Sequence, residues 1–544
     1  MRGVAQAGWR SGLVDGHGIR CGSSACAGRA SAALARLVLA CALIASAGCS
    51  VLPVRAPGPP EHAIDDYSDT RIYRSTVESL PGDGRSAFRI MPIASYAFAT
   101  RVALARDAQK SLDVQYYLLK DDRTGHALMR ELRDAALRGV RVRLLLDDLL
   151  SIGEDPILAD LTAMPHVEVR LFNPFVNGRD GRLSRLFGAL LELGRVDRRM
   201  HNKLFIADNA AVVMGGRNIG DEYFMRSAQA NFIDMDLFVA GPAVRELSQK
   251  FDEYWNSTQV APLARLLGPA PNLEAASADF ERRTADAMSP PPDDLPENLH
   301  VFADLPTEVA QGRVRHLIVA RCVVLADQPD KSQSSADRNF PTVTRSVLAA
   351  IDQARGEVVM VSPYFVPGEL GMEMMREAKP HGGRVVLITN SLASTDAISA
   401  HAGYIRYRKA MLEAGVEIRE LSPSQTRDRQ HFGPFGSSSG SLHAKVIVID
   451  RKRVFIGSMN LDFRSGYENT EVGVLIDSSE LAAQVSGLID EGSFYDLRLN
   501  ADGDVEWVLP NDKSGHVYTA DPETNWFERL VPQLLEPVLP EDEL

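Results

Sequence analysis

The chain has 544 residues, of which 45% are hydrophobic and 24% are charged, and its formal net charge is −13. This composition is typical of a globular protein of two to four domains, and it excludes a disordered chain, a collagen-like fibre and a multi-span membrane protein. The first 48 residues carry a charge of +4, so the charge of the remainder falls to −17. Such an acidic body binds nucleic acid poorly, and we expect no nucleic-acid partner.

Residues 1–48 have the layout of a secretory signal peptide. Arg36 precedes the apolar run 37–47, which is too short to span a bilayer because a span needs about 20 residues. Ala47-Gly48-Cys49 resembles the end of a bacterial lipobox, whose cysteine is lipidated and begins the mature protein, although Ser46 stands where that pattern prefers Leu. We therefore expect a membrane-associated lipoprotein of the bacterial cell envelope that faces the periplasm; the alternative is a disordered extension.

Residues 49–85 are rich in Pro, Asp, Ser and Gly and lack hydrophobic periodicity, so we expect a tether there. After Cys49 the only cysteine is Cys322, and the sequence therefore predicts no internal disulfide. No CxxC or Cys/His cluster predicts a zinc site.

The rest of the chain repeats one order of elements. Strands are predicted at 111–118, 140–147 and 167–171 in the first copy and at 357–361, 384–388 and 416–419 in the second, with helices at 124–138 and 370–378. Their apolar runs are continuous, as burial on both faces of a sheet requires. We expect an α/β fold in which mixed sheets are flanked by helices. Its first domain is predicted at 86–265, a Pro-rich linker at 266–312 and the second domain at 313–535.

A chemical motif also occurs twice, and its key positions are all displaced by 242 residues. The first copy is His201-Asn-Lys203-Leu-Phe-Ile-Ala-Asp208 followed by Gly215-Gly-Arg-Asn218, and the second is His443-Ala-Lys445-Val-Ile-Val-Ile-Asp450 followed by Gly457-Ser-Met-Asn460. At average composition such a pattern arises by chance on the order of 10⁻⁷ times per start position. Two copies therefore exclude coincidence.

Each copy is expected to bring three kinds of phosphate-binding group to one point. Strand–turn–strand hairpins are predicted at 204–214 and 446–456, and residues i and i+2 of a strand share a face, so each His faces the same way as its Lys. The Asn after the return strand comes back toward that face. Paired imidazoles, ammoniums and amides suit a phosphate diester. The catalytic candidates are His201, Lys203, His443 and Lys445, with Asn218 and Asn460 holding the phosphate.

The nearby carboxylates allow two interpretations. Asp208 and Asp450 complete the catalytic motif, but seven residues of extended chain place them more than about 20 Å from the His, which favours a structural role at the turn. Asp236 and Glu471 are candidates to hydrogen-bond the far ring nitrogen of an imidazole; the alternative is a charge at a strand edge. No metal or cofactor is expected, because a Lys two residues from each His repels a cation.

The doubled HxKxxxxD with GxxxN resembles the phospholipase D superfamily, and the segments 112–117, 142–148 and 167–174 resemble its bacterial cardiolipin synthase branch. The resemblance implies two phospholipase D-like βαβ sandwich domains related by a pseudo-twofold axis. It also implies a two-step transfer in which His201 takes the phosphatidyl group as a phosphohistidine and His443 moves the proton. The implied partners are a membrane surface and phosphatidylglycerol, with phosphatidylethanolamine as an alternative donor.

Two other functions remain open at this point. A hydrolytic phospholipase D or a nuclease shares the core motif, and a non-catalytic envelope lipoprotein that only binds lipid is the alternative from another class.

Residues 182–194 combine helically spaced apolar side chains with surrounding Arg, which is typical of a segment that meets anionic lipid; the alternative is a helix packed on the domain. The loop 431–441 is expected to form the opposite lip. The sequence leaves the oligomeric state open.

Overall fold

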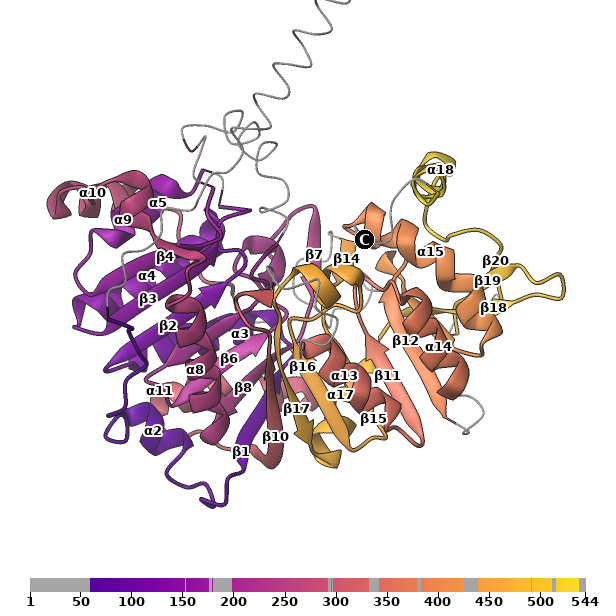
Figure 1. Ribbon diagram of the computed structural model, residues 1–544, viewed down its shortest axis with the longest axis horizontal. Coiled ribbons are helices and arrows are strands. Elements are labelled where there is room, and N and C mark those ends of the chain that lie inside the picture. The colour runs from indigo at the N-terminus through magenta and orange to yellow at the C-terminus, as the bar shows by residue number, and fades with distance from the viewer. Residues whose placement is uncertain are drawn as a thin grey trace, which may run out of the picture. The chain divides into compact units, whose positions relative to one another are not determined.

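The computed structural model describes residues 59–537, apart from 152, 176–178, 180–197, 292–294, 296, 332–341, 379–382, 425–438, 491 and 511–514. One mixed β-sheet of 18 strands runs through both halves of this part of the chain (Figure 1). In the first half its spatial order is β9-β4-β3-β2-β5-β6-β8-β1. These strands are β1 (Ser86–Met91), β2 (Ser111–Tyr116), β3 (Arg141–Asp147), β4 (Val167–Phe172), β5 (Leu204–Ala207), β6 (Ala211–Gly215), β8 (Asp236–Ala240) and β9 (Val260–Pro262).

The second half repeats this order. Its strands run β10-β17-β16-β15-β11-β12-β13-β18, and β19 and β20 extend the edge. An antiparallel pairing of β1 with β10 joins the halves. The strands are β10 (Ile318–Ala326), β11 (Glu357–Val361), β12 (Arg384–Asn390), β13 (Glu417–Leu421), β15 (Val446–Ile449), β16 (Arg453–Gly457), β17 (Val472–Asp477), β18 (Phe494–Leu499), β19 (Val505–Val508) and β20 (Val517–Tyr518). The expected α/β fold with a repeated mixed sheet is thus confirmed.

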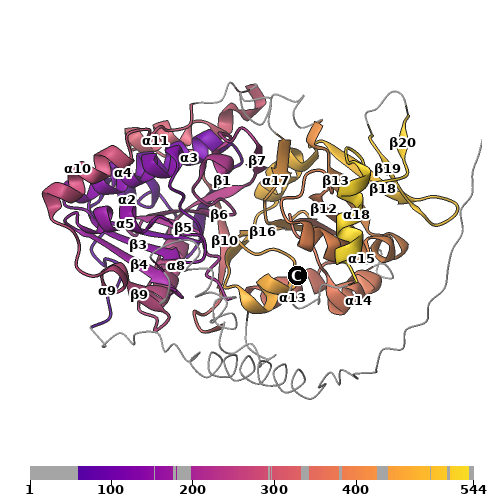
Figure 2. The same ribbon diagram turned by 90° about the horizontal axis from the view of Figure 1, so that it is seen from above.

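Helices cover both faces of the sheet. Figure 2 shows α3 and α4 above it in the first half and α13 and α14 below it in the second. The first half contains α2 (Arg71–Thr76), α3 (Ala94–Asp107), α4 (Arg123–Leu137), α5 (Asp155–Thr162), η1 (Asp221–Phe224) and α8 (Pro242–Trp255). The second contains α13 (Val343–Asp352), α14 (Gly368–Ala378), α15 (Ile398–Glu413), the π-helix η5 (Arg464–Glu468), α17 (Ser479–Asp490) and α18 (Trp526–Leu535). One apolar core, to which both α8 and α17 contribute, continues from one half into the other.

Residues 59–85 do not form the tether that their composition predicts. Glu61 accepts a hydrogen bond from Trp255 Nε1 at 3.0 Å and pairs with Arg170 at 2.5 Å, and the amide of Ala63 donates to Asp252. The chain therefore lies against the first half from residue 61 onward, because buried Arg and Trp side chains there need a carboxylate partner.

The segment 266–312, interpreted from sequence as a linker, is largely helical. After α9 (Leu263–Leu267) it contains α10 (Leu273–Arg283), η2 (Glu297–Phe302) and α11 (Leu305–Gln311). Helix α10 packs on α5 and α11 packs on α3. The segment thus completes the helical layer of the first half.

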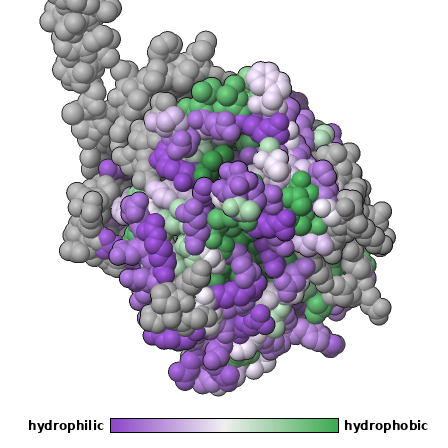
Figure 3. All heavy atoms as spheres, turned by 90° about the vertical axis from the view of Figure 1, so that its right-hand side faces the viewer, coloured by the Kyte–Doolittle hydropathy of each residue, from purple (hydrophilic) through white to green (hydrophobic). Residues whose placement is uncertain are grey.

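The surface carries exposed apolar side chains. Figure 3 shows hydrophobic residues among hydrophilic ones on the side of the second half. Among the described residues, four large exposed hydrophobic side chains lie together on α18: Trp526, Phe527, Leu530 and Leu534. No helix in the described ranges combines the length and apolarity that crossing a membrane requires.

The two motif aspartates lie at hairpin turns and bind backbone amides. Asp208 accepts hydrogen bonds from the amides of residues 109, 110 and 111, and Asp450 from those of residues 355, 356 and 357, at 2.7–3.1 Å. Both adopt left-handed backbone, with φ of 50° and 53°, which Asp tolerates. Each aspartate ties its hairpin to the start of the neighbouring strand, β2 or β11, at the end away from the His. Their position fits the structural role.

Replacing Asp208 with Ala should lower the free energy of unfolding by about 3 kcal/mol, because buried amides lose their acceptor. Asp450 is only partly buried, so Asp450→Ala should cost less, about 1 kcal/mol, since water can replace the carboxylate. Urea unfolding followed by circular dichroism measures both. A stable Asp208→Ala protein that has lost turnover would contradict the structural role.

Candidate active site

The segments that carry the two motif histidines each run beside a segment of the other half. The amide of His201 donates to the carbonyl of Thr470 at 2.9 Å, and the amide of His443 donates to that of Ile233 at 2.8 Å. Ahead of His443, β14 (Ser439–Leu442) pairs in parallel with β7 (Ala230–Ile233) as a separate two-stranded sheet. Backbone pairing therefore fixes each histidine against the residue that follows Thr470 or Ile233.

Those following residues are carboxylates. His201 Nδ1 lies 3.1 and 3.0 Å from the two carboxylate oxygens of Glu471, and His443 Nδ1 lies 2.6 Å from Asp234 Oδ2. Each imidazole is thus held by a carboxylate from the opposite half. Because Nδ1 donates to the carboxylate, Nε2 is the nitrogen left to meet a ligand.

Asp236, expected to orient an imidazole, is placed elsewhere. Its carboxylate pairs with the buried guanidinium of Arg101 at 2.9 Å and with that of Arg217 at 3.3 Å. Asp234 takes the position beside His443 that the sequence assigned to Asp236. Glu471 lies beside an imidazole as expected.

The strand register explains this shift by two residues. In the first half Gly215 is paired with Asp236, and in the second half Gly457 is paired with Gly473. The structural counterpart of Glu471 is therefore Asp234, not Asp236. In the sequence Asp234-Met-Asp236 the two carboxylates have the same strand periodicity, so only the pairing with β6 distinguishes them.

One difference between the motif copies follows from these carboxylates. A Cβ at Gly216 would lie 2.3 Å from Asp234 Oδ1, so this position must be glycine. The equivalent Ser458 instead donates a hydrogen bond to Glu471, and Ser465 donates a second at 2.8 Å. Glu471 is thereby held on three sides. Burial acts to raise the pKa of Glu471, but His201 and its other partners keep it below the ordinary value.

Burial sets the protonation of the imidazoles. His201 and His443 are 7% and 5% exposed. Burial lowers the pKa of His201 to about 4, although the charge of Glu471 acts to raise it. Burial, followed by the charge of Lys445, lowers the pKa of His443 well below its usual value. Without substrate both imidazoles are therefore neutral near pH 7.

The two lysines are buried beside the histidines. Lys203 Nζ donates to the carbonyl of His201 at 2.6 Å, and Lys445 Nζ donates to the carbonyl of His443. Burial lowers the pKa of Lys203 well below its usual value and that of Lys445 to about 8. A bound anion would favour the charged ammonium forms, because an opposite charge nearby stabilises them.

The two motif asparagines can form further hydrogen bonds. The amide oxygens of Asn218 and Asn460 are buried and have no hydrogen-bond partner, while Asn218 Nδ2 donates to the hydroxyl of Tyr223 at 2.9 Å. Turning that amide over would let the tyrosine hydroxyl donate to the oxygen and would place the NH₂ group at the unpartnered position. The site can therefore offer amide donors to a phosphate oxygen.

Several residues of the site carry no motif signal in the sequence. Aromatic rings contact the imidazoles: Tyr117 lies 5.2 Å from His201 between ring centroids, and Tyr223 and Phe232 lie 5.3 and 5.0 Å from His443. Asp147 and Asn390, at equivalent ends of β3 and β12, accept from the amides of Met200 and Leu442 and so fix the residue before each histidine. The only sequence signal that could have identified Asp147 and Asn390 is their equivalent position at the ends of two repeated strands.

Two expected lips of the site lie outside the described residues, namely 182–194 and most of 431–441. Among the residues that are described, no group of three or more His, Cys, Asp or Glu side chains is arranged to hold a metal ion. The described site can receive a phosphate diester between two imidazoles, with two lysine amines and two amides around it.

Asp234→Asn should reduce turnover of a chromogenic phosphodiester by about 10²–10⁴-fold at nearly unchanged stability, because the imidazole of His443 loses its carboxylate. Asp236→Asn is the matched control. It leaves Arg101 buried without its anion, so it should lower the free energy of unfolding by about 3–5 kcal/mol. Its kcat should fall less than that of Asp234→Asn. The reverse pattern of the two variants would restore Asp236 as the orienting residue.

Above pH 8, kcat/KM for the same substrate should fall by about an additional tenfold per pH unit, because free Lys445, with a pKa of about 8, then loses the ammonium that binds phosphate. This fall adds to the pH dependence of the imidazoles, whose pKa values are lower. Lys445→Arg stays protonated and should show lower activity without the additional fall. A wild-type profile whose slope does not steepen between pH 7 and pH 10 would contradict this assignment.

Comparisons with known proteins agree with this geometry. A family model described as cardiolipin synthase, PLD-like domain, matches residues 102–255 and 347–491. The chain is 37% identical over 449 residues to cardiolipin synthase C of Escherichia coli, covering 80% of this chain and 92% of the relative. It is 24% identical over 414 residues to cardiolipin synthase A of Pseudomonas syringae, covering 76% and 69%.

The fold is also found among solved structures. The phosphatidylserine synthase of Haemophilus influenzae matches 83% of this chain with 92% of its own length, at a TM-score of 0.50 and 14% identity. At that identity the likeness concerns the fold. The family match over both halves and the relative at 37% identity show that the chain is a phospholipid-modifying enzyme of the phospholipase D superfamily. The chain belongs to the family of cardiolipin synthases with PLD-like domains.

Proposed function

We propose that the chain is a phosphatidyltransferase that forms cardiolipin by moving a phosphatidyl group to the glycerol head of phosphatidylglycerol. The observation that carries this proposal is the pair of imidazoles, each hydrogen-bonded by a carboxylate of the opposite half. Two such dyads facing one phosphate supply one nucleophile and one proton carrier.

In the first step His201 Nε2 attacks the phosphorus of the donor lipid, and the bond from phosphorus to the head-group oxygen breaks. Neutral His201 suits this role, because its Nδ1–H donates a hydrogen bond to Glu471 and its Nε2 lone pair is free. His443 supplies the proton that the leaving alcohol needs, so it must enter the step as an imidazolium. The anionic phosphate and Asp234 favour that charged form.

In the second step His443, now neutral, takes the proton of the acceptor hydroxyl, and the acceptor oxygen displaces His201 from phosphorus. With phosphatidylglycerol as acceptor the product is cardiolipin. The leaving alcohol of the first step is glycerol from phosphatidylglycerol or ethanolamine from phosphatidylethanolamine. Water as acceptor would give phosphatidic acid instead, which is the hydrolytic alternative.

The test supplies labelled phosphatidylglycerol in EDTA, with and without phosphatidylethanolamine, and separates the lipid products. We expect labelled cardiolipin, a labelled covalent adduct on denatured wild-type protein, none on His201→Ala, and slow accumulation on His443→Ala. Phosphatidic acid as the main product would favour the hydrolase. A label mapped to His443 would exchange the roles of the two histidines. A need for an added divalent ion would overturn the metal-free mechanism.

We also propose that Cys49 is lipidated and anchors the enzyme in the cell envelope. The support is the sequence pattern at 36–49, which lies outside the described residues. Cys49→Ser should move the protein from the membrane fraction to the soluble fraction and leave its turnover of detergent-dispersed lipid within about twofold. An intact mass that keeps residues before Cys49 in membrane-bound protein would exclude this anchor.

A further inference from the structure

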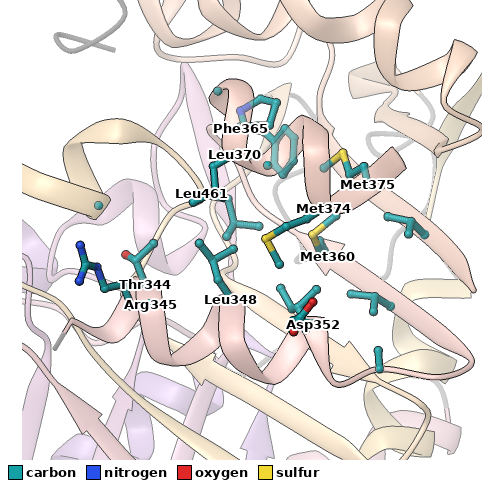
Figure 4. Close-up of a pocket in the computed structure, with 18 of the residues that line it drawn as sticks. Thr344, Arg345, Leu348, Asp352, Met360, Phe365, Leu370, Met374, Met375 and Leu461 are labelled. Carbon is teal, nitrogen blue, oxygen red and sulfur yellow. The ribbon is translucent and has the colours of Figure 1, made fainter. Parts of the chain in front are cut away.

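We propose that a cavity between α13 and α14 holds one fatty acyl chain of the phospholipid substrate. The cavity has a volume of about 650 Å³, and β11 and the segment 461–467 also contribute to its lining (Figure 4). Its volume lies within the range of small-molecule sites, roughly 300–1,000 Å³. This inference rests on the proposed function, because it assigns part of the substrate to a second site.

The apolar part of the lining suits an acyl chain, and charged residues that also line the cavity include Arg345, Asp352 and Arg384. In Figure 4 Leu348, Met360, Met374 and Leu461 lie around one space, and Thr344 and Arg345 lie at its end. Its lining extends along α13 from Thr344 to Asp352, which is about 12 Å of helix. Methionine side chains adapt their shape to an apolar partner, so such walls accept chains of varying form.

The repeat shows that this space is a special feature of the second half. In the first half the equivalent helices, α3 and α4, pack directly on each other, and Phe98 and Phe224 meet at 5.1 Å between ring centroids over α3. Helices α13 and α14 occupy the same places in the order of elements but are separated by the cavity. Apolar side chains that line an open space lack packing partners, which favours an apolar occupant.

The wall of the cavity is linked to the candidate active site through the chain and through hydrogen bonds. Leu461 in its wall directly follows the motif residue Asn460. At its end, Thr344 Oγ1 donates to the carbonyl of Ser465 at 3.3 Å, and Ser465 Oγ donates to Glu471 at 2.8 Å. Two hydrogen bonds therefore connect the cavity wall to the carboxylate that holds His201. A lipid whose phosphate lies at His201 brings its apolar chains to this neighbourhood.

The rim of the cavity gives a chain a way in. Leu370 and Tyr467, both in the lining, are 59% and 44% exposed although they are large and apolar. Exposed apolar side chains around an apolar opening are typical of a binding site for an apolar ligand. We therefore assign the opening to a single acyl chain rather than to a protein segment, because the candidate active site beside it handles phospholipid.

The experiment uses the full chain and measures two quantities: binding of a fluorescent fatty acid, and kcat/KM for dihexanoyl and dipalmitoyl phosphatidylglycerol in detergent micelles. Leu348→Trp fills the cavity, and Leu370→Arg places a charge at its rim. Leu137→Arg on α4 is the matched control, since Leu137 is also 59% exposed on a helix. Thermal unfolding checks that each variant folds, and the rim variant keeps the test valid if Leu348→Trp does not.

We expect the two cavity variants to bind the probe at least tenfold more weakly and to lose at least tenfold in kcat/KM on the dipalmitoyl lipid. Their activity on the dihexanoyl lipid and both properties of Leu137→Arg should stay within twofold of wild type. Unchanged probe binding and chain-length preference in folded variants would overturn the acyl site and leave the proposed function intact. If wild type turns over no phosphatidylglycerol, the proposed function fails; probe binding lost in both cavity variants would still support an acyl site.

Discussion

The candidate active site depends on each half of the protein supplying the carboxylate that binds the histidine of the other half. His201 reaches its carboxylate in the second half and His443 reaches its own in the first, and both carboxylates are fully buried. A buried carboxylate without a partner is strongly unfavourable, so each half needs the other for its own charges to be accommodated. The pairing of β1 with β10 and of β7 with β14 brings these partners into register.

Burial also explains why the site suits an anionic substrate. In the substrate-free protein the imidazoles and lysines are pushed toward their neutral forms, because the interior penalises charge. A phosphate diester brings a negative charge into this interior and favours the protonated forms of the groups around it. In the proposed mechanism, substrate binding and proton uptake are therefore coupled, and the bound phosphate favours the charged form of the general acid.

Much of this could be predicted from the sequence, for a physical reason. Each motif ends on a short hairpin, whose geometry is local, so the turn position of Asp208 and Asp450 follows from strand periodicity. The His and Lys of each copy lie just before the first strand of the hairpin. Asp234 could not be separated from Asp236, since that choice depends on pairing between β6 and β8. Composition alone predicted a tether at 59–85 and a linker at 266–312. For the tether the reason is that Trp255, which binds Glu61, is almost two hundred residues away in the chain.

The exchanged carboxylates also determine when the protein becomes able to react. The contacts of His201 with Glu471 and of His443 with Asp234 join residues 270 and 209 positions apart in the chain. Contacts of such long sequence separation form late, since loop closure must precede them. A chain whose first half alone has been synthesised holds His201 without Glu471 and lacks His443 altogether. The catalytic arrangement of this phospholipid-modifying enzyme is thus incomplete until the chain has been made as far as β17, the strand that follows Glu471.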